Sequence, residues 1–402
     1  MSLNNKINIA YISRTSNLTG AEKITLDLVK ALNKDKFKPI VFLPDNKGVF
    51  YDGLTSSEID TRIIEMPFLR ITYNPFSLMK FFINIIVLNR KFKKIFENEN
   101  IKIVSCNTIH EALFIFRAVS FLKLKLIICF KNILDKKWKK KIRAKFCSKF
   151  AARIIAVSKK AELDYTRFTN SKKENSVVIN DSIDYKDYLN GFKSFEINYP
   201  GKNNLDFIIV NIGSIQELKG QLMLLQAINS DILKNYQIKV FLVGEIYHKN
   251  DTPYKLKIID FIKENALENK VFMPGYQKDV RNYLSFSDLF VHCPVIDDAF
   301  PRVILEAFCL GKITLATRTG GIPEMIEDGF NGYLSEIDKN HLAEKIEFIY
   351  KNRDKLSMIK ENALNSVKDK FSLKTQVRQT EDIYFEILEK RKKQIKSFKN
   401  GK

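Results

Sequence analysis

Short apolar runs alternate with longer amphipathic stretches along nearly the whole chain, and this rhythm constrains the fold more than any other feature. The runs are rich in Ile and Val and do not alternate with polar residues, which is typical of strands buried on both faces of a parallel sheet. They cover residues 7–12, 39–43, 62–64, 101–105, 126–130, 154–157, 177–179, 207–212, 238–243, 271–273, 289–292 and 313–316. The repeated strand–helix–strand order predicts a doubly wound α/β fold.

The length of 402 residues fits two such sheets better than one. A boundary is expected where Pro, Gly and Asn cluster in residues 199–205, just before a fresh strand. We therefore expect an N-terminal Rossmann-like domain over residues 1–200 and a C-terminal one over residues 201–372, facing each other across a cleft. Residues 373–402 read as an amphipathic helix that crosses back to the N-terminal domain, followed by a basic tail.

The formal net charge of +21, from 67 Lys and Arg against 46 Asp and Glu, suits a polyanionic partner. Nucleic acid, an anionic membrane surface and a phosphorylated substrate all meet that description, and the net charge does not choose among them.

The five cysteines are odd in number and widely spaced, without a CxxC pair or a Cys/His cluster, so neither a disulfide framework nor a metal site is expected. The first residues lack a secretory signal pattern, which favours a cytoplasmic protein. The most apolar stretch, residues 78–88, is interrupted by Lys80 and Asn84 and is too short to span a bilayer.

In open α/β sheets, ligands bind beyond the carboxyl ends of the strands. The loop after residues 289–292 leads into a helix expected to begin at Pro301, where the N–H groups of Val303 and Ile304 would offer a seat for a diphosphate. Asp298 precedes this helix and Glu306 lies within it, so both carboxylates could accept hydrogen bonds from sugar hydroxyls.

A simpler interpretation is that Asp297 or Asp298 caps this helix and that Glu306 is a surface residue. The Gly320–Gly321 loop that follows the next strand favours the ligand site instead. A second candidate segment, residues 211–220, places Lys219 at a helix entrance, where an ammonium group could neutralise a diphosphate. Alternatively, Lys219 is a solvated surface residue.

Together these segments resemble the retaining GT-B glycosyltransferases of family four, the group 1 glycosyl transferases. Asp298 and Glu306, eight residues apart and followed by Ala307 and Gly311, are similar to the family's E-x7-E segment, with Asp in place of the first Glu. The resemblance implies that Asp298 addresses the hydroxyls of the donor sugar and that Glu306 addresses the ribose of the nucleotide.

Three further segments carry the resemblance. Residues 213–220 resemble the family's G-R-x4-K-G phosphate clamp, with Ser214 replacing the arginine, so that Lys219 remains as the single cation. The loop near Gly275 and Tyr276 resembles the one that contacts the nucleobase through its backbone. Gly20 and Glu22 resemble the G-G-A-E helix entrance of the N-terminal domain.

The site implied by this resemblance has a donor side and an acceptor side. The catalytic candidates are Asp298, Glu306 and Lys219. The implied donor site comprises Gly20, Gly213, Ser214, Lys219, Gly275, Tyr276, Asp298, Ala299, Phe300, Pro301, Arg302, Val303, Ile304 and Glu306. On the acceptor side we expect Glu22, Lys131 and Asn132, the last two standing where many family members carry a histidine and an acid.

The resemblance implies a retaining transferase that moves a hexose-type sugar from a nucleoside diphosphate, with UDP favoured, to a hydroxyl of a lipid-linked surface glycan such as capsule or lipopolysaccharide. It implies no metal ion or other cofactor. A sugar-nucleotide epimerase of the same fold is an alternative, although the chain has only four histidines. A basic nucleic-acid-binding protein is another, but no recognisable binding motif supports it, and a nucleic-acid partner is not expected. Neither first strand–helix turn carries the GxGxxG of a dehydrogenase.

Two basic segments in the acceptor half suggest an anionic membrane surface as a further partner. Residues 131–149 hold nine Lys or Arg and one acid, and at helical spacing Trp138, Ile142, Phe146 and Phe150 share one side. Residues 75–96 are rich in Phe and Ile and end in a cluster of cations. A core-facing stripe with a solvated basic face is the alternative. If these two segments bind anionic lipid, we expect a peripheral protein on the inner face of the cytoplasmic membrane.

Overall fold

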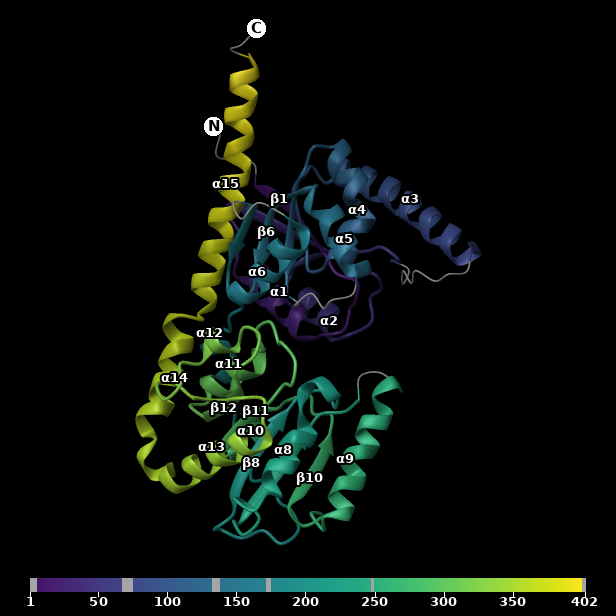
Figure 1. Cartoon of the computed structure of the whole chain (residues 1–402). Coiled ribbons are helices and arrows are strands. Elements are labelled where there is room, and N and C mark those ends of the chain that lie inside the picture. Colours follow the sequence, from purple (N-terminus) through teal and green to yellow (C-terminus); the bar gives the residue numbers. More distant parts are fainter. Residues whose placement is uncertain (1–5, 67–74, 132–137, 171–174, 247–248, 400–402) are drawn as a thin grey trace. The chain divides into compact units, whose positions relative to one another are not determined.

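The computed structural model describes residues 6–66, 75–131, 138–170, 175–246 and 249–399. The chain divides into two compact units, unit 1 from Met1–Asp181 with Leu373–Lys402, and unit 2 from Ser182–Ser372 (Figure 1). Residues 182–200, which the sequence assigns to the N-terminal domain, cluster with unit 2. There Arg281 Nη1 donates to the carbonyl of Tyr188 at 2.8 Å, and the amide of Phe195 donates to Asn282 at 3.3 Å.

Unit 1 contains a seven-stranded sheet of order β3-β2-β1-β4-β5-β6-β7, and each of its neighbouring pairs is parallel. Its strands are β1 Ile7–Ile12, β2 Phe37–Leu43, β3 Asp60–Ile63, β4 Ile101–Cys106, β5 Lys125–Phe130, β6 Ala151–Ala156 and β7 Ser176–Val178. Its helices are α1 Gly20–Ala31, α2 Val49–Ser56, α3 Pro75–Asn98, α4 Ile109–Phe121, α5 Trp138–Ser148, α6 Lys159–Thr169 and α15 Leu373–Lys399.

Unit 2 contains a six-stranded parallel sheet of order β10-β9-β8-β11-β12-β13. Its strands are β8 Phe207–Ile212, β9 Ile238–Val243, β10 Val271–Gly275, β11 Leu289–His292, β12 Ile313–Thr317 and β13 Tyr333–Ser335. Its α-helices are α7 Tyr185–Leu189, α8 Gln221–Ile228, α9 Thr252–Glu264, α10 Arg281–Phe286, α11 Arg302–Cys309, α12 Ile322–Met325, α13 Lys339–Asn352 and α14 Ser357–Asp369.

These two sheets confirm the predicted α/β class of two Rossmann-like domains. Counted from β8, unit 2 has the strand order 3-2-1-4-5-6 of a dinucleotide-binding fold. The order reverses between β1 and β4 in unit 1 and between β8 and β11 in unit 2. Loops that leave the carboxyl ends of these strands diverge there, which creates the position where ligands bind in such sheets.

The core of each unit consists of the apolar runs that the sequence reveals, packed against helices. In unit 1, the aromatic face of α15 completes this core. Tyr384 packs edge-on against Phe37 with ring centroids 5.6 Å apart, and its hydroxyl lies 2.6 Å from that of Tyr11. The C-terminal helix is therefore a structural part of unit 1.

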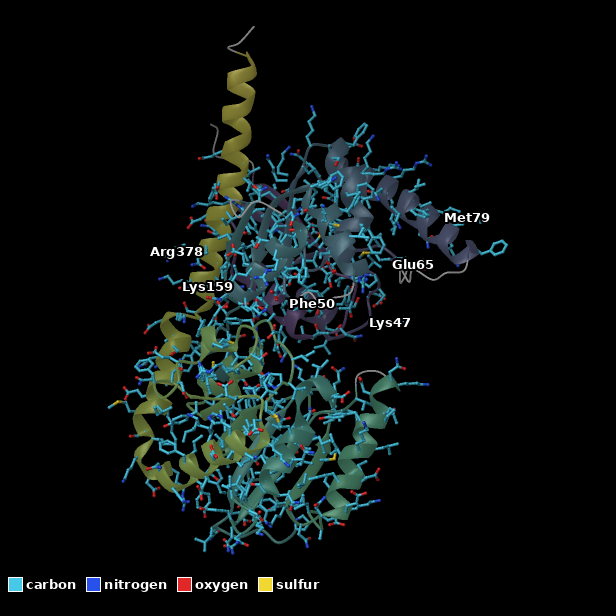
Figure 2. The ribbon with its side chains drawn as sticks, in the orientation of Figure 1. Lys47, Phe50, Glu65, Met79, Lys159 and Arg378 are labelled. Atoms are coloured by element: carbon cyan, nitrogen blue, oxygen red, sulfur yellow. The ribbon has the colours of Figure 1, made fainter. Side chains whose placement is uncertain are left out.

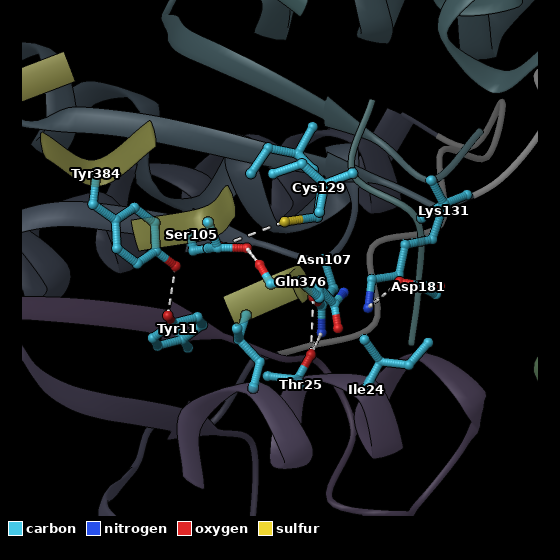
Figure 3. A pocket seen from close by; sticks show the side chains of 15 residues that line it. Tyr11, Ile24, Thr25, Ser105, Asn107, Cys129, Lys131, Asp181, Gln376 and Tyr384 are labelled. Carbon is cyan, nitrogen blue, oxygen red and sulfur yellow. Dashed lines mark hydrogen bonds and ion pairs between the residues drawn. The ribbon is translucent and has the colours of Figure 1, made fainter. Parts of the chain in front are cut away.

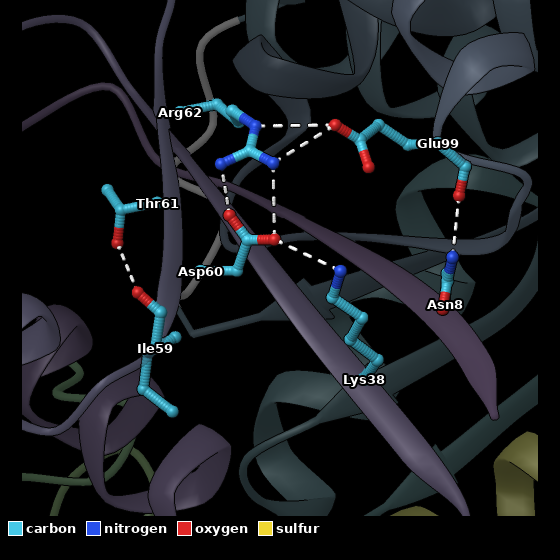
Figure 4. A network of polar contacts seen from close by, with 7 residues as sticks. All are labelled: Asn8, Lys38, Ile59, Asp60, Thr61, Arg62 and Glu99. Carbon is cyan, nitrogen blue, oxygen red and sulfur yellow. Dashed lines mark hydrogen bonds and ion pairs between the residues drawn. The ribbon is translucent and has the colours of Figure 1, made fainter.

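A polar network joins the amino ends of the first strands of unit 1 (Figure 4). The carboxylate of Asp60 in β3 pairs with Lys38 of β2 at 3.2 Å and with Arg62, and Arg62 in turn pairs with Glu99 at 3.2 Å. Asn8 of β1 donates to the carbonyl of Glu99 at 2.6 Å. Since this network lies at the edge opposite to the carboxyl ends, we assign it to the fold and not to a ligand site.

The packing of α15 generates a stability prediction. Replacing Tyr384 by Ala removes a fully buried ring and leaves the Tyr11 hydroxyl without this partner, which should cost unit 1 about 3–5 kcal/mol. Native-state hydrogen exchange of the β1 and β2 amides measures this loss for unit 1 alone. Arg378→Ala, at an exposed position of the same helix (Figure 2), is the matched control. Equal effects of the two substitutions would contradict the assigned packing.

Candidate functional site

The loops that follow β8 and β11 bring the two strongest sequence candidates into contact. Lys219 ends a 3-10 turn, η2 Glu217–Lys219, in the loop after β8, and Asp298 lies in the loop after β11. The Nζ of Lys219 is 2.7 Å from Oδ2 of Asp298. The strand order of unit 2 thus places an ammonium group and a carboxylate together where the order reverses.

His292, the last residue of β11, is a third member of this cluster, which the sequence did not single out. Its Nε2 lies 3.4 Å from the same Oδ2 of Asp298, and the residue is only 2 % exposed. Burial lowers the pKa of His292, and the neighbouring Asp298 only partly opposes this effect. The imidazole is therefore neutral at pH 7, and since an ionised carboxylate only accepts hydrogen bonds, its Nε2 carries the proton.

The carboxylate of Asp298 is ionised. Burial raises its pKa, but the hydrogen bond from His292 and the charge of Lys219 outweigh burial and hold the pKa well below its usual range. The cluster thus combines a cation, an anion and a neutral donor.

Backbone contacts fix the distance between the two loops. Gly220 has a φ of +71°, and a Cβ at this position would lie 2.0 Å from the carbonyl oxygen of Cys293. The amide of Val295 donates to the carbonyl of Leu218 at 3.0 Å. No side chain fits between the loops here, so the glycine is what allows Lys219 to reach Asp298.

The Gly320–Gly321 loop holds Asp298 from the other side. The amide of Gly321 donates to the carbonyl of Asp298 at 2.8 Å. The carboxylate of Asp297 accepts hydrogen bonds from Thr319 at 2.7 Å and from the amide of Gly320 at 2.9 Å. Asp297 thus holds the Gly320–Gly321 loop, and the carboxylate of Asp298 remains available to Lys219 and His292.

The capping interpretation of these acids is wrong. The helix α11 begins at Arg302, one residue later than predicted, its N-cap is Pro301, and no side chain caps it. Asp297 is bonded to the glycine loop, and Asp298 to Lys219 and His292.

The surface interpretation of Glu306 is also wrong, because this residue is 6 % exposed. Its Oε1 lies 3.5 Å from Nε of Arg302, and Nη1 of Arg302 donates to the carbonyl of Ser182 at 3.2 Å. A buried carboxylate needs such a partner, because an unpaired charge in the interior is costly.

The helix mouth itself is anchored by buried side chains. Ala299 and Phe300 are each 6 % exposed, and the ring of Phe300 packs edge-on against Phe371 with centroids 5.6 Å apart. Of the two N–H groups expected to point outward, that of Ile304 donates to the carbonyl of Pro301 at 3.1 Å. In the present conformation it is engaged within the first turn.

The remaining donor-side candidates of unit 2, Gly213, Ser214, Gly275 and Tyr276, lie at the ends of β8 and β10. Gly244, which the sequence did not single out although it directly follows an apolar run, joins these ends. Its amide donates to the carbonyl of Gly275 at 3.0 Å, and a Cβ on it would lie 1.9 Å from the carbonyl oxygen of Gly213. The carbonyl of Ser214 accepts a hydrogen bond from Gln221 at 2.9 Å, and Tyr276 is 75 % exposed.

In unit 1, the candidates lie at the start of α1 and after β5. Gly20 is the first residue of α1, and the buried carboxylate of Glu22 accepts hydrogen bonds from Ser13, at 3.2 Å, and from Thr19. Nζ of Lys131 donates to the carbonyl of Ala21 at 3.3 Å. Lys131 thus reaches the start of α1, while Asn132 lies outside the described residues.

A small cavity of about 30 Å³ with both apolar and polar lining residues lies beside Lys131 (Figure 3). Asn107, Thr25 and Asp181 line it with Lys131. Nδ2 of Asn107 donates to Thr25 at 2.9 Å, and Nζ of Lys131 is 3.9 Å from the Asp181 carboxylate. This volume suits one or two water molecules and is too small for a sugar.

The described part of the chain contains neither a metal-binding cluster nor a membrane-spanning helix. Within residues 6–399 outside the four internal gaps, no group of three or more His, Cys, Asp and Glu side chains is arranged to hold a metal ion. Over the same part of the chain, each helix is too short or too polar to cross a bilayer.

Comparisons with known families cover most of the chain. Residues 193–366 match the family model described as glycosyl transferases group 1, and residues 18–186 match that of glycosyltransferase family 4. The structure of Anabaena HepE in complex with UDP and glucose has a TM-score of 0.76 at 20 % identity, covering 94 % of this chain and 99 % of that one. At this level of identity, the likeness shows a shared GT-B fold.

Two relatives of named activity match over shorter stretches. The N-acetyl-alpha-D-glucosaminyl L-malate synthase of Bacillus anthracis is 30 % identical over 203 residues, which is 50 % of this chain and 49 % of that protein. The lipopolysaccharide 1,2-N-acetylglucosaminetransferase of Salmonella typhimurium is 32 % identical over 142 residues, or 34 % of this chain and 35 % of that protein. The chain thus spans about half and about a third of the lengths of these relatives.

The close approach at Gly320 generates a prediction about the site. Its φ is +58° and a Cβ would lie 2.0 Å from the Asp298 carbonyl oxygen, so Gly320→Ala must displace the Asp298 loop. Gly329 has a φ of +79° with no atom near its missing Cβ, so Gly329→Ala should cost only about 1–2 kcal/mol from the left-handed backbone. We expect Gly320→Ala to cost at least twice as much by urea unfolding of unit 2. Equal costs would contradict the backbone contact.

Proposed function

The chain belongs to the group 1 glycosyltransferases of the GT-B fold, and on that basis we propose that it moves a hexose-type sugar from a nucleoside diphosphate to a hydroxyl of a lipid-linked surface glycan, with retention at the anomeric carbon. The observation that carries this proposal is the contact of Lys219 with Asp298 at the point where the strand order of unit 2 reverses. UDP is the favoured nucleotide, because the Anabaena relative of the same fold was solved with UDP and glucose.

Each member of the site has a role that follows from its charge. Lys219 and the start of α11 stabilise the diphosphate. Glu306, held by Arg302, accepts hydrogen bonds from the ribose, and Asp298 accepts them from the sugar. On the side of unit 1, we assign Glu22, Lys131 and Asn132 to the acceptor.

The proposed reaction occurs on one face of the sugar. The bond from the anomeric carbon to the phosphate oxygen breaks, and the acceptor oxygen bonds to the same carbon from the same side. The acceptor proton passes to the departing phosphate, so no protein base is needed. Negative charge develops on the phosphate oxygen, and Lys219 stabilises this charge more strongly in the transition state than in the bound donor.

The epimerase alternative requires a histidine and an acid that reach the substrate. His292 and Asp298 do meet, but His292 is 2 % exposed and its Nε2 faces the carboxylate. A side chain so enclosed cannot exchange a proton with a sugar ring, which favours transfer over epimerisation.

The assigned roles predict that Lys219→Ala or Glu306→Ala lowers turnover by roughly 100-fold or more while the fold is retained. A thermal-shift panel of nucleotides and UDP-sugars identifies the donor, and NMR of the product reports its anomeric configuration. Lys255→Ala is the matched control, since Lys255 also pairs with an acid, Glu245, in unit 2. Near-normal rates in both site variants, or an inverted product, would refute the proposed mechanism.

The exposed face of α3 supports the proposal that the acceptor is reached at an anionic membrane surface. Between residues 75 and 87 of this helix, Phe76, Met79, Phe82, Ile83 and Val87 are between 49 and 78 % exposed. Figure 1 shows this part of α3 extending beyond the sheet of unit 1, and Figure 2 shows Met79 pointing outward. Exposed apolar side chains gathered in this way indicate an interaction surface.

Cations lie along the same helix. Lys80 stands among the apolar side chains, and Arg90, Lys91 and Lys94 are exposed in the turns that follow. This combination suits the interface of an anionic leaflet, where apolar groups enter the acyl boundary and cations meet lipid phosphates. In α5, the other basic helix, Ile142 is 58 % exposed, whereas the ring of Phe146 packs edge-on against Phe116 with centroids 5.1 Å apart, so this stripe is divided between the surface and the core.

We therefore expect the triple variant Phe76→Ser, Met79→Ser, Phe82→Ser to lose binding to vesicles that contain anionic lipid at low salt. Since a few apolar side chains anchor such a helix, the partition coefficient from sedimentation should fall about tenfold or more. Leu163→Ser, at a 57 % exposed position of α6 in the same unit, should leave it unchanged. If the wild-type protein ignores anionic vesicles altogether, the membrane partner is excluded.

A further inference from the structure

The carboxylate of Asp298 has two protein partners, and both contact the same oxygen. Lys219 lies 2.7 Å and His292 3.4 Å from Oδ2. Among the described residues, no contact falls on Oδ1, while the backbone of Asp298 is fixed by the amide of Gly321. One oxygen is thus held by the protein, and the other is left for a ligand.

The two partners respond differently to a bound nucleoside diphosphate. Lys219 is a cation on a flexible stem and 23 % of its side chain is exposed, so the multiple charge of a diphosphate competes with Asp298 for it. His292 is buried at the end of a strand and carries no charge, so the diphosphate does not attract it. Its ring also lies nearly parallel to that of Phe290, with centroids 6.4 Å apart.

We infer that His292 is a positioning residue, which keeps the Asp298 carboxylate in its sugar-binding orientation when the diphosphate draws Lys219 away. This inference rests on the proposed function, because it assigns Oδ1 of Asp298 to the donor sugar. With a single cation in the phosphate loop and an aspartate shorter than a glutamate, the carboxylate needs a partner that the ligand does not compete for. A neutral Nε2–H donor meets that need without adding a charge that would itself bind phosphate.

Two substitutions separate the hydrogen bond from the packing. His292→Leu keeps an apolar group of similar size and loses the donor, whereas His292→Gln places an amide nitrogen near the position of Nε2. With UDP-glucose and UDP-N-acetylglucosamine as donors, we expect His292→Leu to lower kcat/KM by roughly tenfold or more, in line with the loss of a hydrogen bond to a charged group. His292→Gln should restore most of this loss, and both should bind UDP alone within twofold of the wild type.

A double variant tests whether His292 acts through Asp298. In an Asp298→Asn background, adding His292→Leu should change kcat/KM by less than twofold, because the group that it orients is already altered. A full additional loss in that background, or an equal loss of UDP affinity, would show a general structural role and overturn the inference.

A spectroscopic measurement needs no knowledge of the donor sugar. Nitrogen NMR of labelled histidine should show His292 as the neutral Nε2–H tautomer, both free and with saturating UDP. A protonated ring, or an Nδ1–H tautomer in either state, would refute the assignment. The wild-type protein distinguishes the two levels: if it transfers sugar from no nucleoside-diphosphate donor, the proposed function fails. If the wild type is active, Lys219→Ala is inactive and His292→Leu is normal, only the role of His292 fails.

Discussion

The contact between Lys219 and Asp298 depends on one constraint, the adjacency of β8 and β11. These residues are 79 positions apart in the chain, and their side chains meet at 2.7 Å because the strands that precede their loops are paired in the sheet. Neighbouring strands lie about 5 Å apart, so a shift of either strand by one place would separate the loops by that distance. The strand order therefore determines where the site lies, and the side chains of Lys219 and Asp298 supply its charges.

Glycines allow the loops that follow these neighbouring strands to pack backbone against backbone. At Gly220, Gly320 and Gly244, a carbonyl oxygen of a neighbouring loop occupies the space where a Cβ would stand, at 2.0, 2.0 and 1.9 Å. Contacts between backbones do not depend on the identity of nearby side chains. Ser214 and Asp298 depart from the family pattern only in their side chains, whereas the two loops are held by backbone contacts, and Lys219 and His292 both contact the Asp298 carboxylate.

The sequence predicted the strands because buried parallel strands are continuous apolar runs, and it predicted Lys219 and Asp298 because both stand in loops after such runs. It missed β13 (Tyr333–Ser335), because this strand holds a single aliphatic residue between a tyrosine and a serine and so does not stand out as an apolar run. It missed His292, because a residue at the end of a strand reads as part of the strand, and only the turn of the following loop brings Asp298 to it. The burial of Glu306 was also hidden, since it depends on how α11 packs.

The net charge of +21 is not explained by the residues around Lys219 and Asp298. There Lys219 is paired with Asp298 and Arg302 lies beside Glu306, so each of these two cations already faces an anion. On α3 the situation differs, because Arg90, Lys91 and Lys94 follow within a few turns of the exposed Phe76, Met79 and Val87. Any surface that receives these apolar side chains also meets the cations of the same helix. A bilayer with anionic headgroups satisfies both at once, whereas nucleic acid would leave the apolar groups in water.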